Sequence, residues 1–179
     1  MKKLLVVTLM LFLVGTVFSQ EDKNLEEMKT FLKEKLKVKN DGEIEKCMIR
    51  VRERVKASNG EKINYELLKE SIKISYSNGL DLETAADFAF EVQNQTREME
   101  KYGFSELEAK NYCVKVQNNI VTQEKNNIKK SISNPELKEK LMLTIRTRLQ
   151  EKIKEKIKEK ESSTTGKKTQ QKAKVQKVK

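Results

Sequence analysis

Two cysteines, Cys47 and Cys113, are the side chains of this 179-residue chain best able to form a covalent cross-link. Each lies on the apolar stripe of a predicted helix, the first three residues after Ile44 and the second four residues after Ala109. In an oxidising compartment they could form one disulfide closing a loop of about 66 residues, which chain-entropy theory values at about 4 kcal/mol. Alternatively, they are two small buried hydrophobes that never meet. Both interpretations stay open, because the sequence does not show whether the two helices are neighbours.

The chain contains no histidine, which limits the kinds of catalytic and metal-binding site that it can form. Histidine is the commonest general base and transition-metal ligand, and every Ser-His or Cys-His catalytic pair requires it. Two thiols alone are too few for a zinc site, and no glycine-rich phosphate loop is present. Most carboxylates alternate with lysine, a pattern typical of solvated helix faces. We therefore predict that the chain is not an enzyme and has no catalytic, cofactor-binding or metal-binding residues.

Positive charge is concentrated at the C-terminus. The formal net charge is +11. Residues 1–19 contribute two lysines and residues 162–179 contribute six lysines and no acid, which leaves +3 for residues 20–161. The six lysines, which we consider candidate polyanion contacts, are Lys167, Lys168, Lys172, Lys174, Lys177 and Lys179. The body is therefore nearly charge-balanced, and the basicity belongs to a tail.

Three roles are open for this tail: a solvated solubility tail, an arm that binds polyanions, or an anchor at a membrane surface. Its lysines alternate with Gln, Thr, Ala and Val, without an amphipathic face or aromatic residues. Sequence-specific nucleic-acid binding is therefore not expected. Nonspecific attraction to anionic lipid, glycan or nucleic acid fits six clustered charges and would be sensitive to salt. On the body, Arg50 and Arg54 lie one helical turn apart and offer at most a two-guanidinium patch.

The first nineteen residues have the pattern of a cleavable secretory signal peptide. Lys2 and Lys3 precede an apolar run from Leu4 to Phe18, and small residues come before a cleavage site after Ser19. The run is short for a transmembrane helix, and a polar, charged chain follows it directly. We therefore expect export to the periplasm, the medium or the cell surface.

Glycines and helical periodicity divide the rest of the chain. We interpret Gly42, Gly60, Gly79 and Gly103 as C-caps, because glycine adopts the left-handed conformation without penalty. Apolar residues between them recur at helical spacing. Five to six short amphipathic helices are predicted, packed as a bundle or a compact stack.

Two of these segments form an internal repeat. A shift of 24 residues aligns residues 79–95 with residues 103–119. In the second copy Ser105 and Glu108 have the spacing of a capping box, and in the first Asp81 can cap its own helix. Aromatic residues are concentrated here, and we consider four of them a possible partner-binding face, with core packing as the alternative: Phe88, Phe90, Phe104 and Tyr112.

A longer, charged helix is predicted to begin at Asn134-Pro135. Its apolar residues recur every four residues from Leu137 to Ile157, so the stripe drifts by about 40° at each step. Such a stripe cannot face one flat neighbour throughout. We therefore expect a helical domain over residues 20–150, a projecting charged helix end at 151–161, and a disordered lysine-rich tail at 162–179.

Together these features predict an exported, non-enzymatic, all-α binding protein that holds polyanions or an envelope component through its basic tail. The first alternative is a periplasmic chaperone that holds unfolded clients, since exported, basic helical proteins of this size can do so. The second is a structural or self-assembling envelope protein, although sustained heptads are absent. Candidate partners are anionic lipid, glycan or an envelope protein, and the oligomeric state stays undetermined.

Overall fold

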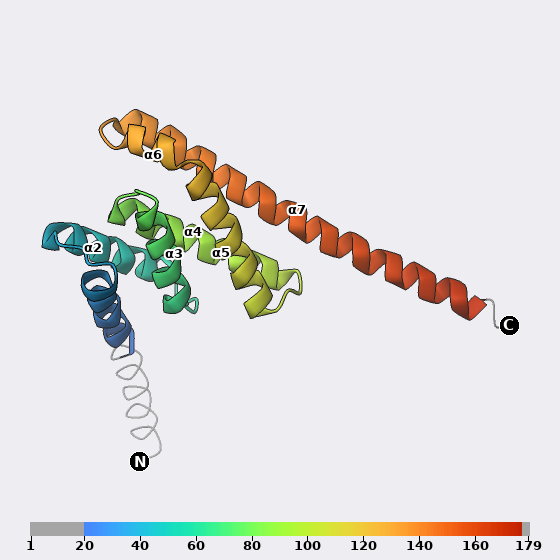
Figure 1. Cartoon of the computed structure of the whole chain (residues 1–179). Coiled ribbons are helices and arrows are strands. Elements are labelled where there is room, and N and C mark those ends of the chain that lie inside the picture. The colour runs from blue at the N-terminus through green and yellow to red at the C-terminus, as the bar shows by residue number, and fades with distance from the viewer. Residues whose placement is uncertain (1–19, 177–179) are drawn as a thin grey trace, which may run out of the picture.

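The computed structural model describes residues 20–176, with side chains described through Ser163, so the predicted signal peptide lies outside the described residues. Within this range the chain forms helices and turns and contains no strand, which confirms the all-α class (Figure 1). Residues 20–30 are helical and continue into a π-helical turn. The remaining elements are η1 (Phe31–Lys35), α2 (Asp41–Ala57), α3 (Tyr65–Ser77), α4 (Leu82–Lys101), α5 (Glu106–Gln123), α6 (Lys125–Ser131) and α7 (Pro135–Gln176).

The helices pack as a compact stack, and the described range holds one short helix more than the sequence pattern reveals. That helix is α6, whose seven residues include a single buried hydrophobe, Ile128. One apolar residue gives no periodicity to recognise. The element is nevertheless fixed in place, because its neighbours are α5 and α7.

Side-chain caps decide where α2 begins. Asn40 lies at its N-cap and its side chain accepts hydrogen bonds from the backbone amides of Gly42 and Glu43. Gly42 is therefore in the first turn of α2, and its predicted role as a C-cap is wrong. An asparagine that captures the first amides starts the helix before the glycine is reached. Gly60, Gly79 and Gly103 do have positive φ angles of 83°, 103° and 80°, which confirms the left-handed conformation at these three positions.

The two copies of the repeat begin their helices in the same way. The Asp81 side chain accepts from the amide of Thr84 at 3.0 Å and caps α4. Ser105 and Glu108 form the predicted capping box at the start of α5. The first-turn alanines Ala85 and Ala109 are both fully buried, so their small side chains let neighbouring helices approach closely.

Helix α4 is the centre of the body. It contacts α2, α3, α5 and α7. Ten of its twenty residues are buried: Leu82, Ala85, Ala86, Phe88, Ala89, Phe90, Val92, Gln93, Thr96 and Met99. Because so many faces of α4 are covered, it acts as the common scaffold of the fold.

Helix α7 lies beside α4 in the same direction along their whole shared length. Three polar contacts show this register: Lys138 with Asp81 at 2.7 Å, Gln150 with Glu91 at 3.0 Å, and Lys160 with the carbonyl of Gly103. Helix α5 runs the opposite way, so α7 packs along the seam between two antiparallel helices (Figure 1).

This position corrects the prediction that residues 151–161 project into solvent. Ile153 is fully buried and Ile157 is only 6% exposed, whereas Leu137 near the start of α7 is 48% exposed. Two neighbours, α4 and α5, cover a wider arc of α7 than one flat neighbour would, so the drifting apolar stripe stays buried. The backbone of α7 also continues as helix to Gln176, past residue 162 where the sequence predicts disorder. Residues 162–166 are weak helix formers, but the Lys, Gln and Ala residues after them favour a helix and no proline interrupts it.

Candidate interaction surface along helix α7

The apolar stripe of α7 packs this helix on the body and so positions the candidate site. Ile145, Leu149 and Ile153 are fully buried, and Met142 and Ile157 are each 6% exposed. These residues pack against α4, α5 and α6, which are the neighbours of α7. The stripe thereby fixes the direction in which the rest of α7, including its basic end, leaves the body.

Two aromatic residues, Phe104 just before α5 and Tyr112 within it, contact the last part of this seam. The Nζ atom of Lys160 lies 3.9 Å from the centre of the Phe104 ring, and that of Lys156 lies 5.8 Å from the Tyr112 ring. The Tyr112 hydroxyl also donates to the backbone carbonyl of Lys152 at 3.3 Å. Burial raises the pKa of the Tyr112 phenol, which keeps it protonated as a donor near neutral pH. These are cation–π contacts supported by one hydrogen bond.

The four aromatic residues considered as a partner face do not form one exposed surface. Phe88 is fully buried and Phe90 is 6% exposed, because α4 has neighbours on several sides. Phe104 and Tyr112 are partly buried, and their covering partner is α7 of the same chain. Core packing, the alternative that the sequence left open, therefore describes the arrangement of these four residues.

A groove of about 690 Å³ runs between the second half of α4 and α7. Its apolar lining includes Ile153, Ile157 and Tyr102, the last 45% exposed at the C-cap of α4. Amide and charged side chains complete the lining: Glu61, Asn94, Gln95, Arg97, Glu98, Lys101, Gln150, Lys154, Lys158 and Glu161. Ile153 and Ile157 are buried beneath the groove, so the groove combines one exposed aromatic ring, that of Tyr102, with a charged rim.

The charges on this rim are not all neutralised within the groove. Arg97 is paired with Glu61, and Lys101 with Glu98 at 3.1 Å. Lys154 and Lys158 are exposed and lie one turn apart on α7. Neither has a carboxylate within ion-pair distance among the described residues. The groove therefore presents two ammonium groups without ion-pair partners beside the half-exposed ring of Tyr102.

Sequence reasoning missed the residues that make this groove. Lys154 and Lys158 stand among many alternating lysines and glutamates, so nothing local distinguishes them. One signal for the groove was present in the sequence, namely Tyr102. This aromatic residue directly precedes Gly103, which ends α4, and a side chain at such a position lies at the boundary of the core. Only the placement of α7 beside α4 brings the three residues to one groove.

The structure also places the two cysteines. Both are buried as free thiols. Cys47 is on α2 and Cys113 on α5, and α4 contacts both of these helices. Burial raises the pKa of Cys47 to about 12 and that of Cys113 to about 11, so both stay protonated near neutral pH. Cys113 lies with its sulfur 3.6 Å from the sulfur of Met99. The arrangement corresponds to two small core residues, and no disulfide is present in it.

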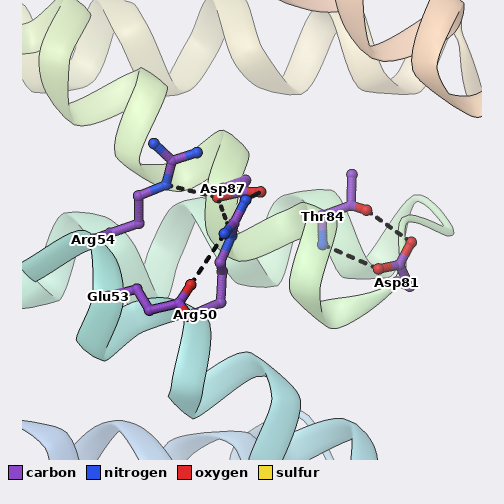
Figure 2. Close-up of polar contacts among 6 residues, drawn as sticks. All are labelled: Arg50, Glu53, Arg54, Asp81, Thr84 and Asp87. Atoms are coloured by element: carbon purple, nitrogen blue, oxygen red, sulfur yellow. Dashed lines mark hydrogen bonds and ion pairs between the residues drawn. The ribbon is translucent and has the colours of Figure 1, made fainter. Parts of the chain in front are cut away.

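The arginine pair has a structural partner (Figure 2). Asp87 of α4 accepts from Arg50 through both oxygens, at 2.8 and 2.9 Å, and from the Nε of Arg54 at 2.8 Å. Glu53 takes a further donor of Arg50 at 3.1 Å. Burial opposes ionisation of Asp87, but the bonds and charges of the two guanidinium groups outweigh it, and the pKa of this carboxyl is lowered. The pair thus joins α2 to α4.

The lysine tail lies at the end of α7. Lys167, Lys168, Lys172 and Lys174 belong to the helical backbone of α7, and their side chains lie outside the described part. Lys177 and Lys179 lie outside the described residues altogether. The structure therefore shows where the tail leaves the body, at the end of the seam with α4 and α5.

Comparisons with known proteins add no relationship: no family model, no curated protein and no solved structure matches the chain. Among the described residues, no helix is long and apolar enough to cross a membrane. In the same part of the chain, no group of three or more potential ligand residues is arranged to hold a metal ion.

Proposed function

We propose that the chain is an exported, non-enzymatic binding protein that attaches to polyanions through the basic end of α7. The observation that carries this proposal is the continuity of α7. One helix of 42 residues contains both the stripe that packs on the body and four of the six lysines in the acid-free tail. A bound polyanion would thus be joined directly to the folded domain.

The charges of the body serve mainly to join its helices, whereas those of the tail are available for binding. Its charges are largely balanced, and many are paired across helices, such as Lys110 with Glu70 at 3.1 Å and Lys138 with Asp81 at 2.7 Å. The tail contains no acid with which its lysines could pair. Electrostatic attraction to an anion is therefore strongest at the tail, and it should weaken steeply with salt.

The test measures binding of the mature chain to immobilised heparin, a soluble polyanion, over a range of salt. A matched variant replaces all six tail lysines with glutamine and keeps the chain length. On DNA, about six lysine contacts lose roughly a thousandfold in affinity between about 50 and 200 mM salt. We expect a comparably steep loss for the natural chain and no measurable binding by the glutamine variant.

A second variant, ending at Glu161, separates the charge of the tail from its length. Loss of binding in both variants, with the far-ultraviolet circular dichroism of the glutamine variant unchanged, would support the proposal. Unchanged heparin binding in the glutamine variant would overturn it. A tail-independent ability to prevent aggregation of an unfolded client would favour the chaperone alternative instead.

A further inference from the structure

The groove between α4 and α7 has a property that the tail lacks, namely an exposed aromatic ring beside cations without an ion-pair partner. Tyr102 is 45% exposed, whereas Ile153 and Ile157, which line the same groove, are buried. Lys154 and Lys158 stand on the rim without carboxylate partners among the described residues. A purely polar anion would use the lysines and leave the half-exposed ring of Tyr102 in water. An anionic amphiphile would satisfy both.

We propose that this groove docks the protein on an anionic phospholipid bilayer, with Lys154 and Lys158 at the phosphate groups and Tyr102 in the headgroup region. The inference rests on the proposed polyanion binding and names its target as a lipid surface. A tyrosine with an apolar ring and a polar hydroxyl is suited to such an interface. Lysine stems can cover apolar surface while their ammonium groups reach the phosphates.

The position of the groove agrees with that occupant. Lys158 and Glu161 line the groove at the point where α7 leaves the body, and the acid-free stretch begins at residue 162. The same helix therefore carries the groove lysines and continues into six more. Each lysine near an anionic leaflet strengthens binding about fivefold, so the two sets reinforce one another on one surface.

The other charges of the groove do not cancel this attraction. Glu61 and Glu98 are already paired with Arg97 and Lys101. Of the seven charged residues in the lining, four are positive and three are negative. The third acid, Glu161, directly precedes the acid-free tail with its six lysines.

The first experiment places a reporter in the groove of the full mature chain. The natural sequence has no tryptophan, so Tyr102→Trp supplies a single emission signal. The matched control is Ile49→Trp on α2, a position with 47% exposure against 45% for Tyr102. Vesicles containing equal parts of phosphatidylglycerol and phosphatidylcholine should shift the emission of the first variant to shorter wavelength and leave the control unchanged. Heparin should shift neither.

The second experiment tests the lysines by vesicle co-sedimentation. Lys154→Gln with Lys158→Gln should lower the partition coefficient about thirtyfold, from the contribution expected for two lysines at an anionic surface. The control pair, Lys125→Gln with Lys129→Gln, has the same spacing on α6, is equally exposed and removes the same charge. Its effect should be less than about threefold, because this pair lies outside the groove.

The outcomes separate this inference from the proposed function. An emission shift at Tyr102 together with a selective loss at Lys154 and Lys158 supports lipid docking, even if the tail-glutamine variant still binds heparin. Equal losses for the two lysine pairs, or an emission shift with heparin alone, would overturn lipid docking at the groove. Binding that disappears only in the tail-glutamine variant would overturn it as well, while leaving polyanion binding by the tail intact.

Discussion

The two sides of α4 differ in how much directional bonding is added to apolar packing. On one side, α2 is joined to α4 by a carboxylate that receives both Arg50 and Arg54, and the Asp87 side chain is only 13% exposed. On the other side, α7 is held mainly by Ile145, Leu149 and Ile153, all fully buried. Polar contacts on that side are single and more exposed. Helix α2 also buries apolar residues, among them Ile44, Met48 and Val51, so the difference is the directional carboxylate contact that α2 has in addition to apolar burial.

The largest effect is expected from removing an apolar contact between α7 and its neighbours. Ile153→Ala should lower the free energy of unfolding by about 3 kcal/mol, because a fully buried isoleucine leaves a cavity. Urea unfolding followed by circular dichroism measures the change. Leu143→Ala on the same helix, where the side chain is 66% exposed, is the control and should cost less than about 0.5 kcal/mol. Equal effects would show that the seam does not stabilise α7.

The polar side is tested by Asp87→Asn, which keeps the shape of the side chain. We expect a loss of about 2 kcal/mol, because the three charge-assisted hydrogen bonds from Arg50 and Arg54 lose their ionised acceptor and the two guanidinium groups remain close together. The loss should be smaller than for Ile153→Ala, since both arginines can still be hydrated by water. A double-mutant cycle with Arg54→Gln measures how much of it is interaction across the interface. A coupling near zero would contradict the proposed role of Asp87.

The same carboxylate predicts a dependence on pH. The pKa of Asp87 is lower in the folded chain than its ordinary value, so its contribution is present above that ordinary value and is lost as the pH falls through the folded-state pKa. The natural chain should therefore lose more stability below about pH 4 than the Asp87→Asn variant does. Urea unfolding at a series of pH values measures the two curves. Parallel curves over that range would show that Asp87 is not the responsible group.

Local features of this fold were predictable because they depend on neighbouring residues. The caps at Asp81 and Ser105 and the left-handed glycines at 60, 79 and 103 each follow from side-chain chemistry within a few positions. Gly42 failed because Asn40, two residues earlier, starts a helix. A glycine alone does not distinguish the end of one helix from the first turn of the next.

The placement of α7 could not be predicted because it depends on contacts between distant residues. A stripe that drifts by about 40° at each step excludes one flat neighbour, and this reasoning is correct. The sequence does not show, however, that α4 and α5 together form a wider surface for Ile153 and Ile157. The aromatic residues Phe104 and Tyr112 looked available to a partner for the same reason, because the chain's own α7 was not yet placed on them.

The smallest effect concerns the end of the apolar seam, where Lys160 lies 3.9 Å from the centre of the Phe104 ring. A double-mutant cycle between Lys160→Gln and Phe104→Leu should give a coupling of about 0.5 to 1 kcal/mol, the range for an exposed cation–π contact. The matched pair of Lys156 and Tyr112, separated by 5.8 Å, should couple more weakly. Urea unfolding measures both cycles. If the shorter contact coupled as strongly as Asp87 with Arg54, directional bonds would position α7 as well as α2, and the contrast between the two sides of α4 would be lost.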